Sequence, residues 1–171
     1  LLVALGHCLQ QAGQLELAAR AFDAALRIGK VELETWHAAE LAETAALCLA
    51  LTRSVQGHID DARRVLEQAV GAYSHSHRLV RHLLDIQIRQ GDYHAALKTV
   101  HRLNVPGDEK QRFCIAVRGA CRAAGRQWDE ALSDLQSAYL GGCKDTIVLR
   151  WLAAVLFQTG HIMAAEPVLA D

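Results

Sequence analysis

Apolar residues recur along this chain at helical spacing, and a glycine interrupts the recurrence at nearly regular intervals. Ahead of the first such glycine, one helix face carries small and apolar residues in the i, i+3, i+4, i+7 pattern: Leu2, Leu5, Gly6 and Leu9. The glycines are spaced by 44, 34, 34 and 35 residues: Gly13, Gly57, Gly91, Gly125 and Gly160. This pattern predicts a pair of helices around each glycine, which takes the left-handed conformation that ends the first helix.

The segment after each glycine repeats two further features. An alanine stands five residues after four of the glycines and six residues after the fourth one: Ala18, Ala62, Ala96, Ala131 and Ala165. A larger apolar residue follows four positions later: Phe22, Leu66, Val100, Leu135 and Leu169. Because positions four apart share a helix face, we expect both residues to be buried where the second helix meets its neighbours.

The repeats resemble the tetratricopeptide repeat (TPR) family over nearly the whole chain. The residues that carry the resemblance are Leu5-Gly6 with Gly13, Ala18, Phe22 and Ala25, then Gly91-Asp92-Tyr93 with Ala96, and Trp128-Asp129-Glu130-Ala131. The resemblance implies an all-α fold, a right-handed superhelical solenoid of stacked antiparallel helix pairs. The chain departs from the family at Arg53 and Gln87, which stand where an aromatic residue is usually buried.

A period of about 34 residues predicts five units in one solenoid domain, residues 1–171. The units fall at about residues 1–30, 35–75, 76–108, 110–143 and 145–171. Solenoids need polar caps at both ends, and neither end of this chain has one. We therefore expect a fragment of a longer protein, or ends that are covered by a partner or by a second copy of the chain.

The second unit is longer than the others by about ten residues. Its segment Thr35–Gln56 contains no glycine or proline, which predicts a first helix extended by about two to three turns. The extension can serve as a partner site or an oligomer contact, or it can be an insertion without a role.

Composition restricts the classes of function. The net charge is −1, with six Lys/Arg against nine Asp/Glu in residues 1–75 and twelve against ten in residues 76–171, so we expect no nucleic-acid binding. No apolar run is long enough for a transmembrane helix. The five cysteines include no CxxC motif, and we expect them to be reduced and mostly buried, which favours a cytoplasmic location.

Residues that commonly carry chemistry do not form a recognisable site. His75 and His77 are the closest pair of histidines, and none of the nine histidines has a partner at the i, i+4 spacing of helical metal ligands. No glycine-rich phosphate loop or G-x-S-x-G motif occurs. We therefore expect no metal, no cofactor, no catalytic residues and no enzymatic activity in this segment.

The surface left for function is the concave groove, which in TPR proteins is lined by the first helix of each pair. On the face of those helices opposite the packing stripe, the second unit presents an apolar strip and the later units present several basic residues. The candidate partner-binding residues are Leu47, Leu51, Val55, Arg78, Arg81, His82, Arg89, Arg112, Arg122 and Arg150. Arginine pairs well with carboxylates, so the groove is predicted to take an acidic or amphipathic segment.

The sequence therefore favours an interaction scaffold that binds other proteins or peptide segments and does not insert into a membrane. Two alternatives remain open: a self-associating structural module, which would form homo-oligomers, and a secretion or targeting chaperone that holds an exported protein.

Overall fold

The computed structural model describes residues 1–31, 36–73, 76–102 and 106–170, with the side chains of residues 29–31 and 36–38 left out. Across these ranges every regular element is a helix. The chain divides into two compact units, Leu1–Leu83 and Leu84–Asp171. Each unit is described by itself, and the single continuous superhelix over residues 1–171 stays a prediction.

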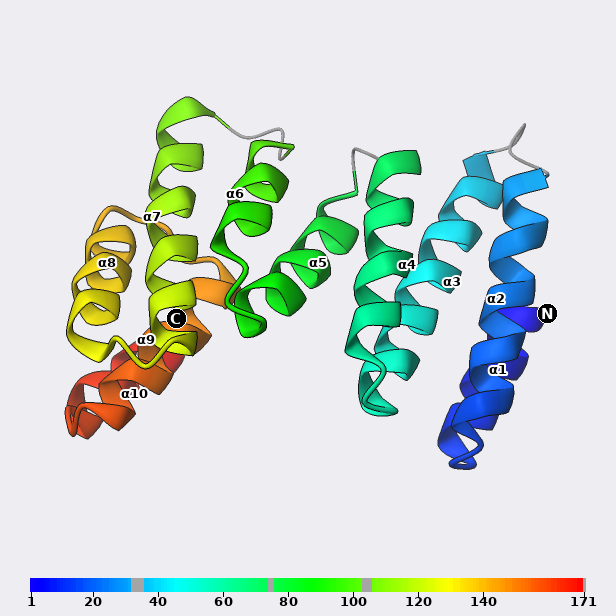
Figure 1. The fold of residues 1–171 in the computed structure, drawn as a ribbon, viewed down its shortest axis with the longest axis horizontal. Coiled ribbons are helices and arrows are strands. Elements are labelled where there is room, and N and C mark those ends of the chain that lie inside the picture. The colour runs from blue at the N-terminus through cyan, green and yellow to red at the C-terminus, as the bar shows by residue number, and fades with distance from the viewer. Residues whose placement is uncertain (32–35, 74–75, 103–105, 171) are drawn as a thin grey trace. The chain divides into compact units, whose positions relative to one another are not determined.

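Unit 1 contains the first four helices (Figure 1). They are α1 (Leu2–Gln11), α2 (Leu15–Val31), α3 (Trp36–Val55) and α4 (Ile59–Ala72). Helix α2 packs against α1 and α3, and α3 packs against α4. Helix α5 (His77–Arg89) begins in unit 1 and ends in unit 2.

Unit 2 contains the remaining helices: α6 (Tyr93–His101), α7 (Gly107–Ala124), α8 (Trp128–Leu140), α9 (Thr146–Gln158) and α10 (Ile162–Ala170). Helix α7 packs against α6, α8 and α9, while α9 packs against α8 and α10. The division into five repeat units stays a prediction, and its limits at positions 35, 75 and 171 lie outside the described residues.

The predicted second-helix alanines form the core of each unit. All five are buried, and in four of the pairs the larger apolar residue four positions later is buried too. In the last pair the prediction is wrong: Val168 is buried and Leu169 is exposed. Successive residues of a helix are rotated by about 100°. Helix α10 therefore packs against α9 through the face that carries Val168, and Leu169 points away from that contact.

The glycines end the first helices as expected, with one exception. Gly13, Gly57, Gly91 and Gly160 have φ between 71° and 83°, but Gly125 has φ −81°. In that turn Arg126 takes the left-handed conformation, with φ 61°. The extra residue between α7 and α8 moves the left-handed position one residue along the chain, onto a side chain that adopts it at a cost.

The second helix pair, α3 and α4, has the lengthened first helix that the sequence predicts. Helix α3 has 20 residues, against 10 in α1 and 13 in α5. Thr35 lies outside the described residues. Among the described residues, no helix has both the length and the hydrophobicity needed to span a bilayer.

The cysteines form no disulfide bond. Cys48, Cys121 and Cys143 are buried as expected, but Cys8 is exposed because it lies on the side of α1 away from its neighbours. Burial raises the pKa of Cys121 to about 11, and it also raises the pKa values of Cys114 and Cys143. These thiols are therefore protonated at neutral pH and fill space as small apolar groups.

Candidate interaction surface

The first helices of unit 1 are joined by polar contacts along α3. Gln10 on α1 donates a hydrogen bond from Nε2 to Thr52 Oγ1 at 3.0 Å, and Thr52 donates to the Cys48 carbonyl at 2.7 Å. Cys48 Sγ lies 3.7 Å from His7 Nε2. These contacts fix α1 beside the C-terminal half of α3.

The start of α5 is fixed to the other side of α3. Ser76 donates from its hydroxyl to Glu43 Oε1 at 2.6 Å and accepts from the backbone N–H of Leu79 at 3.2 Å. Burial raises the pKa of the Cys48 thiol, and the positive charge of Arg78 acts against that rise.

The predicted apolar strip on α3 is partly buried and partly open. Leu47 is only 5% exposed, so its side chain packs in the core of unit 1 and is not available to a partner. Leu51 is 41% exposed and Val55 is 71% exposed. Cys48, Leu51 and Val55 share one helix face, so we define the α3–α5 surface by the exposed residues Leu51, Val55 and Arg78.

The two remaining predicted residues of unit 1 follow on α5. Arg81 is exposed and His82 is half-buried. Both have interactions with other groups of the chain, so neither is counted among the residues open to a partner.

In unit 2, two of the predicted arginines share one acid. Asp85 on α5 forms ion pairs with Arg89, at 3.0 Å, and with Arg150 on α9. The Arg150 guanidinium also lies 6.0 Å from the centre of the Trp151 ring. The Asp85 cluster consists of Asp85, Arg89 and Arg150. It carries two positive charges and one negative charge.

A third predicted arginine, Arg122, also shares an acid with another arginine, and that acid lies on α8. Asp134 on α8 accepts two hydrogen bonds from Arg118, at 2.9 and 2.7 Å, and one from Arg122, at 2.6 Å. Burial favours a raised pKa for Asp134, but the hydrogen bonds and charges of the two arginines outweigh it and hold that pKa below its ordinary value. This Asp134 cluster, Asp134, Arg118 and Arg122, joins α7 to α8.

Gly119 permits that junction. A Cβ atom at Gly119 would lie 2.9 Å from Asp134 Cβ and 2.9 Å from Leu135 Cγ, and 3.2 Å from the Ala131 carbonyl oxygen. The absence of a side chain therefore lets α8 approach α7 closely enough for Asp134 to reach both arginines.

Arg112, near the N-terminal end of α7, packs its side chain against α8. Its Cδ would lie 2.9 Å from a Cβ added to Gly141, and its Nε is buried with no hydrogen-bond partner among the described residues. The aliphatic part of Arg112 thus covers the C-terminal end of α8.

Sequence reasoning identified Arg122 but missed both Arg118 and Asp134. The signal was present: an acidic residue interrupts the apolar stripe of Ala131, Leu135 and Ala138 on α8, and Arg118 and Arg122 stand four residues apart on α7. A carboxylate in a buried stripe needs a cationic partner.

The described residues contain no group of three or more His, Cys, Asp or Glu side chains arranged to hold a metal ion. Of the two histidines that the sequence places closest together, His75 lies outside those residues.

Comparison with known proteins rests on structure alone. No protein-family model matches the chain, and no curated protein is significantly similar to it in sequence. Several solved structures match the chain at low sequence identity, and three of them are described next.

A tetratricopeptide repeat protein from Parabacteroides merdae matches 98% of this chain and 62% of its own, with 16% identity and a TM-score of 0.60. MamA from Desulfovibrio magneticus matches 98% of this chain and 88% of its own, with 10% identity and a TM-score of 0.57. YrrB, described as a TPR protein with an unusual peptide-binding site, matches 99% of this chain and 81% of its own, with 19% identity and a TM-score of 0.51. The helix pairs, their turn glycines and these similarities together show that the chain has the tetratricopeptide repeat fold.

Proposed function

We propose that this protein is a non-enzymatic interaction scaffold whose first helices bind an amphipathic segment of a partner protein that carries acidic residues. The fold supports this proposal, because its first helices present side chains on a face that the core does not use. YrrB, which has the same fold, is described as binding peptides.

The observation that carries the proposal is the α3–α5 surface. Leu51 and Val55 are large apolar side chains left exposed one helical turn apart on α3. Arg78 is exposed in the first turn of α5, and none of the described residues forms an ion pair with it. Covering each apolar side chain contributes on the order of 1 kcal/mol, and an acidic residue of the partner would pair with Arg78.

The Asp85 cluster, which lies within unit 2, offers a second place where arginines can bind a carboxylate of a partner. Two arginines share one carboxylate there, so the cluster has an excess of one positive charge. A carboxylate from the partner would balance that charge by bridging Arg89 and Arg150.

The test begins with selection of twelve-residue peptides from a random display library on the wild-type protein. Their affinity is then measured by fluorescence anisotropy. We expect apolar and acidic residues to be enriched. The double variant Leu51→Asp, Val55→Asp should lower the affinity for the selected peptides at least tenfold. Arg78→Glu should lower the affinity for the acidic peptides about tenfold.

A matched control replaces two apolar residues of similar exposure on α2, Leu17→Asp and Ile28→Asp. Equal affinity of the peptides for the wild type and for the α3 double variant would contradict the proposal. Arg122 is unsuitable for a charge-reversal test, because a glutamate there would lie beside Asp134 and would measure stability instead.

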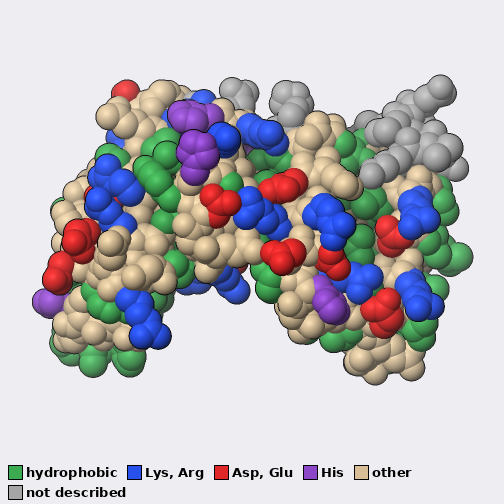
Figure 2. Space-filling view, in the orientation of Figure 1, with side chains coloured by type: hydrophobic (Ala, Val, Ile, Leu, Met, Phe, Trp, Pro, Cys, Tyr) green, Lys and Arg blue, Asp and Glu red, His purple; other side chains and the backbone are tan. Residues whose placement is uncertain are grey.

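Self-association is the second candidate. Exposed apolar side chains surround the turn between α9 and α10 in unit 2: Phe157, Ile162 and Met163. Figure 2 shows hydrophobic side chains gathered at that end of α9 and α10. Sedimentation velocity over a range of concentrations tests this candidate, and a sedimentation coefficient that does not change with concentration would exclude it.

A further inference from the structure

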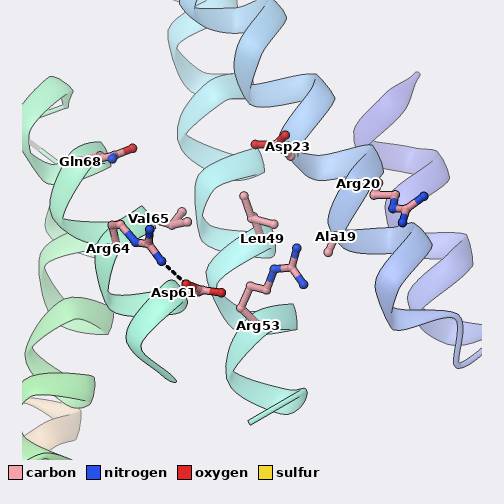
Figure 3. Close-up of a pocket in the computed structure, with 9 residues that line it drawn as sticks. All are labelled: Ala19, Arg20, Asp23, Leu49, Arg53, Asp61, Arg64, Val65 and Gln68. Atoms are coloured by element: carbon pink, nitrogen blue, oxygen red, sulfur yellow. Dashed lines mark hydrogen bonds and ion pairs between the residues drawn. The ribbon is translucent and has the colours of Figure 1, made fainter. Parts of the chain in front are cut away.

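Unit 1 has a hollow on the side of α3 that does not carry the α3–α5 surface. The hollow, of about 360 Å³, is open to solvent and lined by residues of α2, α3 and α4, and Figure 3 shows α3 between the other two helices. Leu49 and Arg53 reach it from α3. Residues 49 and 53 are four apart, whereas Leu51 lies about 200° around the helix from Leu49. The α2–α4 hollow and the α3–α5 surface are therefore on opposite faces of α3.

The hollow is lined by more basic than acidic side chains. Three arginines line it, Arg20, Arg53 and Arg64, together with two aspartates, Asp23 and Asp61. Its size falls within the range of small binding sites. One positive charge is left over, and Figure 2 shows basic and acidic side chains interspersed around this face of α2 and α4.

Arg53 and Arg64 approach the hollow from different helices. In Figure 3 their guanidinium groups lie on either side of Asp61, and Arg64 is paired with that aspartate. Arg53 donates from Nη1 to Glu16 at 2.9 Å and to Gln56 at 3.1 Å. A guanidinium has five N–H donors, so each arginine keeps donors that no described residue accepts.

The acids that now accept from these arginines are exchangeable. The Glu16 and Asp61 side chains are 53% and 46% exposed. Ion pairs at such exposure are weak, because solvent screens the two charges. Asp23, the other acid of the hollow, is occupied by Arg27 at 2.8 Å. A further carboxylate can therefore enter without breaking a strong contact.

We propose that the α2–α4 hollow binds the carboxylate of an acidic side chain from a partner polypeptide, held between Arg53 and Arg64. Asp61, which already pairs with Arg64, competes with that carboxylate. A single negative charge matches the single positive excess, whereas a phosphate dianion would meet the repulsion of Asp23 and Asp61 as well. This site is separate from the one in the proposed function.

The test uses a blocked peptide, acetyl-Ala-Glu-Ala-amide, added to the ¹⁵N-labelled protein and followed by NMR through the arginine Nε–Hε signals. We expect the signals of Arg53 and Arg64 to shift. Replacing Arg64 with Gln should weaken binding about tenfold. Asp61→Asn should tighten it at least twofold, because the competing carboxylate is removed.

Three further probes identify the chemistry: acetyl-Ala-Gln-Ala-amide, the same Gln peptide with a free C-terminal carboxylate, and inorganic phosphate. The Glu peptide should bind most tightly. Tighter binding of the terminal carboxylate or of phosphate, equal binding of the blocked Gln peptide, or unchanged binding to the Arg64→Gln variant would each overturn the proposal.

Two control variants separate this site from the rest of the chain. Arg102→Gln, an exposed arginine at the end of α6, should leave the titration unchanged. The double variant Leu51→Asp, Val55→Asp should also leave it unchanged, since those residues face the other way. Loss of binding in that double variant would place the peptide on the α3–α5 surface and would overturn the hollow as its site.

Discussion

The arginines of the two units differ in the burial of the acids that bind them. In unit 1, Arg53 and Arg64 pair with Glu16 and Asp61, whose side chains are about half exposed. In unit 2, the shared acids Asp85 and Asp134 are 19% and 9% exposed. An arginine can leave an exposed acid at little cost, but leaving a buried acid strands a charge.

The comparison separates arginines that are available to a ligand from arginines that hold the fold together. Arg118 and Arg122 belong to the second kind, because they neutralise a carboxylate inside the α7–α8 contact. Arg53 and Arg64 belong to the first kind. The Asp85 cluster lies between the two, with an acid that is mostly buried and arginines whose side chains are 62% and 45% exposed.

The largest expected effect is on the Asp134 cluster. We expect Asp134→Asn to lower the free energy of unfolding by about 2 kcal/mol, less than for a fully buried pair because the arginines are partly exposed. Urea denaturation followed by circular dichroism measures the change. Asp129→Asn, at an exposed position in the first turn of the same helix, is the control and should change stability by under about 0.5 kcal/mol. If both variants lowered the free energy of unfolding equally, Asp134 would not be a structural acid, and the contrast between the arginines of unit 1 and unit 2 would be wrong.

The pH dependence of that difference follows from the lowered pKa of Asp134. The folded pKa lies below the ordinary value of 3.8. The stabilisation is therefore fully present well above that value and is lost as the pH falls through the folded pKa. Urea denaturation of the wild type and of Asp134→Asn at several pH values between 7 and 2.5 should give curves that converge only at the acid end. Convergence already at pH 6 would contradict the assignment.

A smaller effect is expected from closing the gap that lets α8 approach α7. Gly119→Ala should destabilise the protein by about 1 kcal/mol, because the steric cost of the added Cβ exceeds the gain in helix propensity. Gly71→Ala in unit 1, where an added Cβ meets no atom within 4 Å, should instead be stabilising by up to about 1 kcal/mol. Thermal unfolding monitored at 222 nm gives both signs, and a shift in the same direction for both would refute this explanation.

The smallest expected effect is in the α2–α4 hollow. Arg64→Gln should change the free energy of unfolding by less than about 0.5 kcal/mol, since it removes only an exposed ion pair. The same urea titration measures it beside Asp134→Asn. A loss as large as that of the Asp134 variant would mean that Arg64 is structural and not free to bind a ligand.

Much of the fold could be predicted from the sequence because it depends on local rules. The glycines, the alanines five residues later and the helical spacing of apolar residues located the helix pairs. The rule was less reliable where a single residue shifts the pattern. Arg126 takes the left-handed position in place of Gly125, and Val168 takes the buried position in place of Leu169.

The site was predicted less completely, because partners meet only in the folded chain. Arg150 and Asp85 are 65 residues apart, and Arg118 and Asp134 are 16 apart. The sequence placed Arg89, Arg122 and Arg150 on helix faces. It hinted at an acid for Arg89 and for Arg122, but nothing along the chain links Arg150 to Asp85. Likewise, Leu47 was expected on the open face of α3, whereas packing buries it.

The sequence by itself determined the helix pairs and their core, because the periodicity of small and apolar residues acts within one or two turns. Only the tertiary structure decided which charges are committed and which are available. That distinction depends on how deeply each acid is buried, which follows from the approach of helices such as α7 and α8 and not from the spacing of residues along either one.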